Sequence, residues 1–99
     1  MIVMEMNWKG VTPAQYDEAK KRIDWVSNPD PQGVLHIAWF DNGALRCYDV
    51  WETEAAFNDF VQNRLMPGIE GLGIEGPPEV RMHQAHDTFV LPKVLAGVN

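Results

Sequence analysis

A tight turn in the middle of the chain fixes the register of a β-hairpin, and that register decides which polar side chains meet. The segment Asp41-Asn42-Gly43-Ala44 contains the Asn-Gly pair typical of a two-residue hairpin turn. Counting outward from the turn, one residue at a time on each strand, places His36 directly opposite Asp49. We therefore predict a histidine and a carboxylate side by side on one face of a sheet, among apolar neighbours.

The segments around this hairpin alternate between strand and helix patterns. Thr12 and Thr53 are each suited to cap a helix, because a threonine hydroxyl accepts a hydrogen bond from the first turn. The expected elements are, in order, a strand over 2–8, a helix over 13–27, hairpin strands over 33–40 and 45–51, a helix from 54 that Pro67-Gly68 ends or kinks, and a strand over 79–86.

This element order predicts an α+β fold of the ferredoxin-like βαββαβ type. Right-handed crossovers place both helices on one face of a four-stranded antiparallel sheet. The hairpin is apolar on both faces, so the bare face would expose large side chains. Burial against a second copy would recover roughly 1.5–3 kcal/mol for each of them. We predict a homodimer, with a domain over 1–86 and a C-terminal tail over 87–99 that packs on the partner subunit or is disordered.

Composition argues against several classes of partner. The 99 residues include 14 acidic and 8 basic ones, for a net charge of -6, which disfavours nucleic acid and anionic membrane surfaces. The single cysteine, Cys47, fits a reducing compartment. The sequence shows neither a signal-peptide pattern nor an apolar stretch of membrane-spanning length. We therefore expect a cytoplasmic protein without nucleic-acid or membrane partners.

The junction after the hairpin carries a family resemblance. Asp49-Val50-Trp51-Glu52-Thr53-Glu54-Ala55-Ala56-Phe57 is similar to the V-W-x-[ST]-x-x-[AE]-[FL] junction of antibiotic biosynthesis monooxygenase-like proteins. With the element order, it makes residues 2–86 resemble this group of the dimeric α/β-barrel superfamily. The resemblance implies a dimeric α/β barrel, and relatives include cofactor-free oxygenases of phenolic substrates, haem-degrading enzymes and isomerases or cyclases of polyketide type.

The haem-degrading branch of this group does not fit the chain. Asn7 matches that branch's first-strand asparagine, but Phe60 stands where it has a tryptophan, and Glu70 lies near the position of its haem-ligating histidine. A carboxylate does not replace a neutral imidazole as the usual haem ligand. We therefore predict no haem and no other cofactor.

His36 and Asp49 are the predicted catalytic pair. The carboxylate would fix the imidazole tautomer, so that the ring removes a phenolic or α-carbonyl proton, while Asn7 hydrogen-bonds a substrate oxygen. The residues predicted to contact substrate are Glu5, Trp51, Phe60 and His83. The predicted function is that of a small-ligand-binding dimeric α/β-barrel protein, as a cofactor-independent monooxygenase or proton-transfer enzyme acting on aromatic or polyketide-like molecules.

Each of these interpretations has a structural alternative. His36 and Asp49 also suit a cross-strand hydrogen bond at the dimer face of a non-catalytic binding or assembly module. Glu5 and Asn7 suit either a polar pocket shared with that pair or a strip that faces solvent or the interface. His36, His83 and Glu5 have the composition of a two-histidine, one-carboxylate metal set. Only composition supports that set, so we predict no metal site.

Two further motifs are interpreted as structural. Gly71-Leu72-Gly73-Ile74-Glu75-Gly76 spells a dinucleotide-binding fingerprint, but that motif requires a strand before it and a helix after it. Here a helix precedes the glycines and a strand follows them, so we predict a loop. Cys47 lies within a strand, away from any helix N-terminus that would activate it, and is predicted to be buried and inert.

Overall fold

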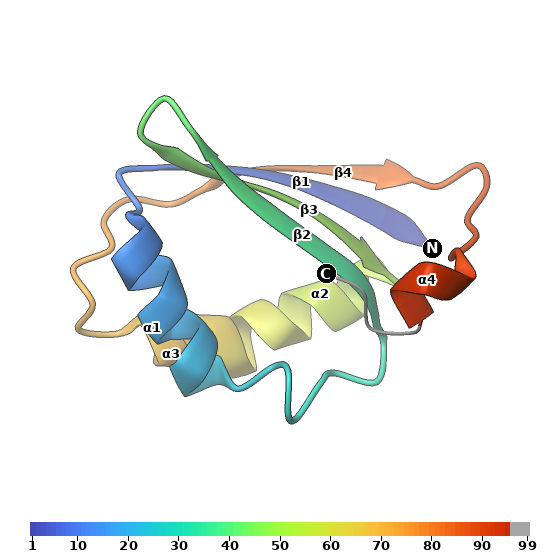
Figure 1. The fold of residues 1–99 in the computed structure, drawn as a ribbon, viewed down its shortest axis with the longest axis horizontal. Helices are drawn as coiled ribbons and strands as arrows, with labels where there is room; N and C mark the ends of the chain where they lie inside the picture. Colours follow the sequence, from blue (N-terminus) through green and yellow to red (C-terminus); the bar gives the residue numbers. More distant parts are fainter. Residues whose placement is uncertain (96–99) are drawn as a thin grey trace.

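The fold is a four-stranded antiparallel sheet with a layer of helices on one face (Figure 1). The computed structural model describes residues 1–95. The strands are β1 (Ile2–Lys9), β2 (Gly33–Asp41), β3 (Ala44–Trp51) and β4 (Glu79–Gln84). Their order across the sheet is β2-β3-β1-β4, with every neighbouring pair antiparallel. This is the ferredoxin-like arrangement, and the predicted fold class is confirmed.

The helices lie below the sheet in the view of Figure 1. They are α1 (Pro13–Ile23), α2 (Glu54–Phe60), the π-helical turn η1 (Val61–Leu65) and α3 (Met66–Ile69). A further short helix, α4 (Pro92–Leu95), lies beside the end of the sheet at which β1 begins. Among the described residues, the opposite face of the sheet carries no helix.

The hairpin register is the predicted one. Asp41 pairs with Ala44, and His36 pairs with Asp49. Asn42 and Gly43 both have positive φ, 50° and 71°, as a two-residue turn of type I′ requires. The turn sequence therefore sets the position of every side chain along both hairpin strands up to the irregularity between Gly33 and Leu35.

The hydrophobic core lies between the sheet and the helices. Alternate residues of β1 supply its sheet side, as the sequence pattern predicts, and all are buried: Ile2, Met4, Met6 and Trp8. Phe57 and Phe60 of α2 pack against Trp51 at the end of β3, with ring centroids 5.8 and 5.1 Å from its ring. The helix-covered face is thus an aromatic and aliphatic layer, and the functional groups described below lie within it.

The first helix is shorter than predicted. It ends at Ile23, because Asp24 adopts the left-handed conformation with φ of 58° and its N–H bonds to the Lys20 carbonyl. The predicted end at residue 27 is therefore wrong. Ending the helix at this point brings Trp25 against the His36 ring, with centroids 5.1 Å apart, and leaves Val26 68% exposed.

The second helical segment continues past Pro67. Its hydrogen-bond register changes before the proline, where the Met66 N–H bonds to the Val61 carbonyl five residues back. The segment then resumes α-helical geometry and runs to Ile69, and Pro67 is tolerated because it lies in the first turn of α3. The sequence predicts that the helix ends or kinks at Pro67-Gly68. It does not end there, and its hydrogen-bond register changes just before the proline. The last strand is also shorter than predicted and ends at Gln84, not at residue 86.

Candidate functional site

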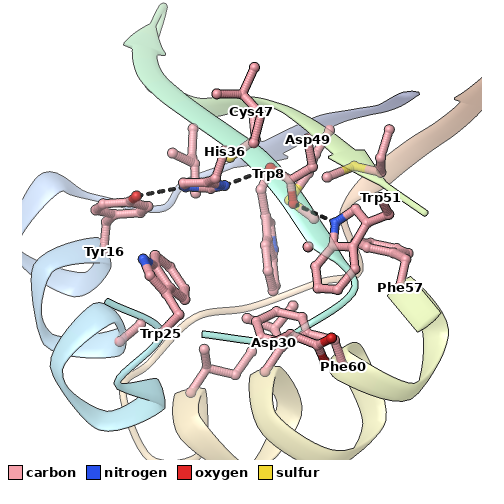
Figure 2. A pocket seen from close by; sticks show the side chains of 18 of the residues that line it. Trp8, Tyr16, Trp25, Asp30, His36, Cys47, Asp49, Trp51, Phe57 and Phe60 are labelled. Atoms are coloured by element: carbon pink, nitrogen blue, oxygen red, sulfur yellow. Dashed lines mark hydrogen bonds and ion pairs between the residues drawn. The ribbon is translucent and has the colours of Figure 1, made fainter. Parts of the chain in front are cut away.

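A cavity of about 220 Å³ lies between the sheet and the helices (Figure 2). Side chains from β1, α1, the segment after α1, β2, β3 and α2 line it, and most of them are apolar. Its aromatic members are Trp8, Tyr16, Trp25, His36, Trp51, Phe57 and Phe60. An apolar hollow walled by rings is the kind of site that takes a small planar molecule.

A continuous chain of hydrogen bonds runs along the sheet side of this cavity. Tyr16 Oη lies 2.8 Å from His36 Nε2, and His36 Nδ1 lies 2.6 Å from Asp49 Oδ1. Trp51 Nε1 donates to Asp49 Oδ2 at 3.2 Å. Figure 2 shows these contacts as dashed lines from α1 across β2 to β3. The predicted pairing of His36 with Asp49 is therefore formed, and a tyrosine and a tryptophan extend it at either end.

The donors and acceptors of this chain have assignable directions. An indole N–H only donates, so Asp49 Oδ2 accepts from Trp51, and the other carboxylate oxygen accepts from His36 Nδ1–H. In the neutral imidazole the remaining nitrogen, Nε2, then carries a lone pair and accepts from the Tyr16 hydroxyl. The Asp49 side chain is 10% exposed and that of His36 is 34% exposed, so the chain runs from the interior toward the cavity rim.

Burial keeps two neighbouring groups protonated. It raises the pKa of Tyr16 to about 12, with smaller contributions from the negative forms of Cys47, Asp49 and Asp17. Burial, and then the Asp49 carboxylate, raises the pKa of the Cys47 thiol to about 12. At neutral pH Tyr16 is therefore a hydroxyl donor. Cys47 is buried, as predicted, and its raised pKa favours the unreactive thiol form.

The N-terminus of α1 holds Tyr16 in place. Thr12 and Gln15 form a reciprocal capping box: Thr12 Oγ1 accepts from the Gln15 N–H at 3.2 Å, and Gln15 Oε1 accepts from the Thr12 N–H at 3.0 Å. The Tyr16 ring is stacked parallel to His36 at 6.2 Å and meets Phe40 edge-on at 6.1 Å. The hydroxyl therefore reaches His36 from a ring that is fixed on several sides.

Comparison with known proteins gives structural likeness without sequence likeness. No family model and no curated protein sequence matches the chain. A candidate antibiotic biosynthesis monooxygenase of Deinococcus radiodurans superposes with a TM-score of 0.62 at 9% identity, covering 92% of this chain and 98% of that one. The cofactor-independent oxygenase SnoaB of Streptomyces nogalater gives 0.61 at 18% identity, covering 88% and 93%.

A third similar structure carries a ligand. It is a monooxygenase of Streptomyces coelicolor in complex with nanaomycin D, with a TM-score of 0.59 at 18% identity, covering 91% of each chain. The chain has the fold of the antibiotic biosynthesis monooxygenase-like proteins. The resemblance drawn from the junction after the hairpin and from the element order is thereby confirmed at the level of fold.

Of the predicted substrate contacts, two line the cavity and two do not. Trp51 and Phe60 lie in its wall with His36 and Asp49. In the sheet register Met4 pairs with Asp49, whereas Glu5 is one residue further along β1 and so faces the other side. His83 Nε2 lies 2.7 Å from Glu5 Oε1 on that side.

Asn7 also lies on the face away from the helices, where it pairs with Arg46. The expected polar pocket joining Glu5 and Asn7 to the histidine and aspartate is therefore not formed, because side chains along a strand alternate between faces. The alternative, a strip that faces solvent or an interface, describes their positions.

The same separation of faces rules out the hypothetical metal set of His36, His83 and Glu5, since His36 lies on the opposite face from Glu5 and His83. Among the described residues, no three histidine, cysteine or carboxylate side chains cluster as metal ligands do.

His36 and Asp49 lie on the helix-covered face of the sheet, among the residues that line the cavity. The alternative role for the pair, a cross-strand hydrogen bond at a dimer face, stays a prediction. Within residues 1–95, no helix has the length and apolar character needed to span a membrane.

The glycine-rich segment is a loop between α3 and β4, as predicted, and its Gly76 carbonyl accepts from Trp8 Nε1 at 3.1 Å.

Sequence reasoning missed the role of Tyr16. Tyr16 lies on the apolar stripe of the first helix with Ala19 and Ile23, and a residue in such a stripe is expected to pack in the core. A half-buried tyrosine hydroxyl needs a hydrogen-bond partner, and that need was the available signal. The identity of the partner depends on how α1 crosses the sheet, which no local pattern specifies.

Proposed function

We propose that the cavity binds a small, flat, largely apolar molecule with an acidic hydroxyl, and that His36 drives the removal of that proton. The observation that carries this proposal is the hydrogen-bonded chain from Tyr16 through His36 to Asp49 in the wall of an otherwise apolar cavity. A histidine held by a carboxylate is the usual arrangement for a general base. Trp51 and Phe60 line the space in which a planar ligand would lie.

The size and lining of the cavity support an aromatic ligand. An apolar protein cavity of ~150 Å³ is sufficient to hold benzene. The cavity here measures about 220 Å³ and is walled by five aromatic rings besides Tyr16 and His36. The Streptomyces coelicolor monooxygenase of the same fold is complexed with nanaomycin D, and SnoaB is described as a cofactor-independent oxygenase. Aromatic or polyketide-like molecules are therefore the proposed substrate class.

The proposed reaction is oxygenation without a cofactor. Loss of the hydroxyl proton gives an electron-rich anion, and the ring carbon para to the oxygen donates electrons to O2. The overall change converts a phenol with a para C–H, together with O2, into a para-quinone and H2O: one oxygen atom enters the product, the other leaves as water, and the substrate supplies all the electrons. The protein needs only to accept the proton, orient the ring and exclude water.

We also propose that two copies associate through the face of the sheet that carries no helix. Large side chains are exposed there, among them Ile37 at 48%, Trp39 at 36% and Tyr48 at 44%. Asn7 Oδ1 is buried on this face and has no hydrogen-bond partner within the described residues. A second copy would cover the rings and supply that partner.

The outer face also has charges that suit self-association. A hollow of about 210 Å³ there is lined by residues of both signs: Glu5, Arg46, Glu79 and Arg81. A surface with acids and bases interspersed can pair with its own copy across a twofold axis. The tail is proposed to pack on the partner, because Phe89 is 76% and Leu91 is 56% exposed. The last residues of that predicted tail, 96–99, lie outside the described residues.

One observation favours a non-catalytic binding module as the second candidate. Both nitrogens of His36 already have partners within the chain, as they do in a histidine that only stabilises a fold. In this case the cavity binds a ligand, and the histidine and aspartate hold β2 and β3 together.

Oxygen uptake with a dihydroxynaphthalene tests the catalytic proposal, and native mass spectrometry tests the dimer. We expect a dimer that consumes O2, and a loss of about tenfold or more in turnover for His36→Gln. The matched control is His86→Gln, which changes an exposed histidine beyond the end of β4. Equal turnover in both variants and the wild type would contradict the role of His36, and a monomer would contradict the proposed interface.

A further inference from the structure

The imidazole of His36 has no free nitrogen with which to meet a ligand. Nδ1 donates to Asp49 at 2.6 Å, and Nε2 is bonded to the Tyr16 hydroxyl at 2.8 Å. A ligand in the cavity therefore meets either a displaced Tyr16 or Tyr16 itself. The same choice applies to any ligand, because both ring nitrogens are already hydrogen-bonded within the chain.

Several contacts hold Tyr16 in place, so a ligand bonds to Tyr16 more easily than it displaces Tyr16 from His36. Its ring lies parallel to that of His36 with centroids 6.2 Å apart, lies edge-on to Phe40, and has its centroid 5.9 Å from that of Trp25. The capping box at Thr12 and Gln15 anchors its helix, and Gln15 Nε2 also donates to the Leu72 carbonyl at 3.0 Å. Moving the hydroxyl aside would disturb several of these contacts together.

The Tyr16 oxygen can accept a second hydrogen bond while it donates the first. A phenol carries one proton and two acceptor lone pairs. Among the described residues, Tyr16 Oη bonds only to His36, and Tyr16 lines the cavity. A ligand hydroxyl in the cavity would thus find an acceptor that is already linked to a base.

We propose that Tyr16 is a catalytic residue of the site: it receives the ligand's hydroxyl proton while passing its own proton to His36. This inference rests on the proposed function. The ligand O–H bond breaks as a new Tyr16 O–H bond forms, and the old Tyr16 O–H bond breaks as His36 Nε2–H forms. The products are a ligand oxyanion, a neutral tyrosine and an imidazolium; charge is conserved, and nothing is oxidised or reduced.

The surroundings favour both ends of this transfer. The imidazolium lies against the Asp49 carboxylate, which Trp51 Nε1–H keeps oriented. After the transfer, Tyr16 donates to the ligand oxyanion and accepts from His36 Nε2–H, so these two hydrogen bonds are kept with their directions reversed. The two hydrogen bonds to Asp49, from His36 Nδ1–H and from Trp51 Nε1–H, keep their directions.

The probe for this relay is para-nitrophenol, whose oxyanion absorbs visible light. At a pH just below the probe's own pKa, wild-type protein should increase the oxyanion absorbance. Tyr16→Phe keeps the ring contacts and removes only the hydroxyl; it should bind the probe with similar affinity and give about tenfold less bound oxyanion. The matched control probe, para-nitroanisole, has no proton to give and should bind both proteins equally. Thermal unfolding checks that the variant is folded.

The possible results distinguish the relay through Tyr16 from the proposed function of the cavity. Undiminished or increased oxyanion in Tyr16→Phe would overturn the relay and show that His36 meets the ligand directly. In that case loss of the oxyanion in His36→Gln alone would still support the proposed base. If neither probe binds to the wild-type protein, the cavity is not a site for such ligands, and both the proposed function and the relay are overturned.

Discussion

The two faces of the sheet are made from alternate residues of the same strands, yet they satisfy their polar groups in different ways. On the helix-covered face, Asp49 is hydrogen-bonded at both carboxylate oxygens, by His36 and by Trp51. On the bare face, the Glu5 and His83 pair is solvent-accessible at 39% and 51%, and Asn7 Oδ1 has no partner within the described chain. The inner face is complete within one chain, whereas the outer face is not.

This difference favours a different kind of binding partner for each face. A buried polar group without a partner costs about 1–3 kcal/mol, so a chain that retains one is expected to satisfy it through something outside itself. The inner face, with its hydrogen bonds made and its cavity open, suits a small ligand. The outer face, with exposed rings and an unpaired amide oxygen, suits a second copy.

The largest expected effect is on the alkylation rate of Cys47, which should be far lower than that of an exposed cysteine. Its pKa is raised from 9.0 to about 12, a difference of three units, so the reactive thiolate fraction near pH 8 is about a thousandfold lower. We expect alkylation by iodoacetamide to be slower by orders of magnitude in the folded protein than in the denatured protein. The denatured protein should react at the rate of a free thiol, and the same rate in the folded protein would contradict the burial of this face.

Removing Asp49 should destabilise the fold strongly. Asp49→Ala leaves His36 Nδ1–H and the buried Trp51 Nε1–H without their acceptor, at a cost of about 3 kcal/mol in the free energy of unfolding. Denaturant unfolding measures this change. A loss below about 1 kcal/mol, the size expected for an exposed pair, would show that the inner hydrogen bonds are no stronger than those at the surface.

Removing Trp39 should affect association and not the fold. Trp39→Ser deletes an exposed ring that lies 5.1 Å from the Tyr48 ring, and should weaken the dimer by about 2 kcal/mol, or roughly thirtyfold in Kd. Sedimentation across a concentration series measures this effect. Val26→Ser is the control, because Val26 is also an exposed apolar residue but lies just beyond α1. Equal effects of both substitutions would contradict the proposed interface.

The ionisation of Tyr16 predicts a stability loss at alkaline pH. Its pKa is about 10 in the unfolded chain and about 12 in the folded one, so the folded state retains the proton longer. The resulting stabilisation is complete below pH 10 and is lost as the pH rises from 10 to 12. Tyr16→Phe should reduce this loss and remove a tyrosinate absorbance transition near pH 12. An unchanged transition in the variant would show that Tyr16 is not the shifted group.

The smallest effect is expected for the outer ion pair. Glu5→Gln keeps the shape of the side chain and removes its charge next to His83, with both groups well exposed. Such a pair contributes at most about 1 kcal/mol, and less at high salt. Unfolding at low and high ionic strength measures the change. A loss as large as that of Asp49→Ala would remove the distinction between the two faces.

The sequence specifies the pairing of His36 with Asp49 because an Asn-Gly turn fixes register locally. It does not specify which face of the hairpin meets the helices, since large apolar side chains lie on both. The sequence also does not specify the partner of Tyr16, because that partner depends on how α1 crosses β2. The crossing is set by tertiary packing, and no run of neighbouring residues encodes it.

The position of the imidazole proton of His36 in the free protein is the most direct test of the hydrogen-bonded chain from Tyr16 to Asp49. Long-range nitrogen–proton NMR spectra distinguish the two neutral imidazole tautomers, and His36→Gln assigns the signals among the three histidines. At a pH at which the ring is neutral, we predict the proton on Nδ1, toward Asp49, and an unprotonated Nε2 that accepts from Tyr16. A proton on Nε2, or an averaged mixture of the tautomers, would contradict the hydrogen-bonded chain on which the proposed base and relay depend.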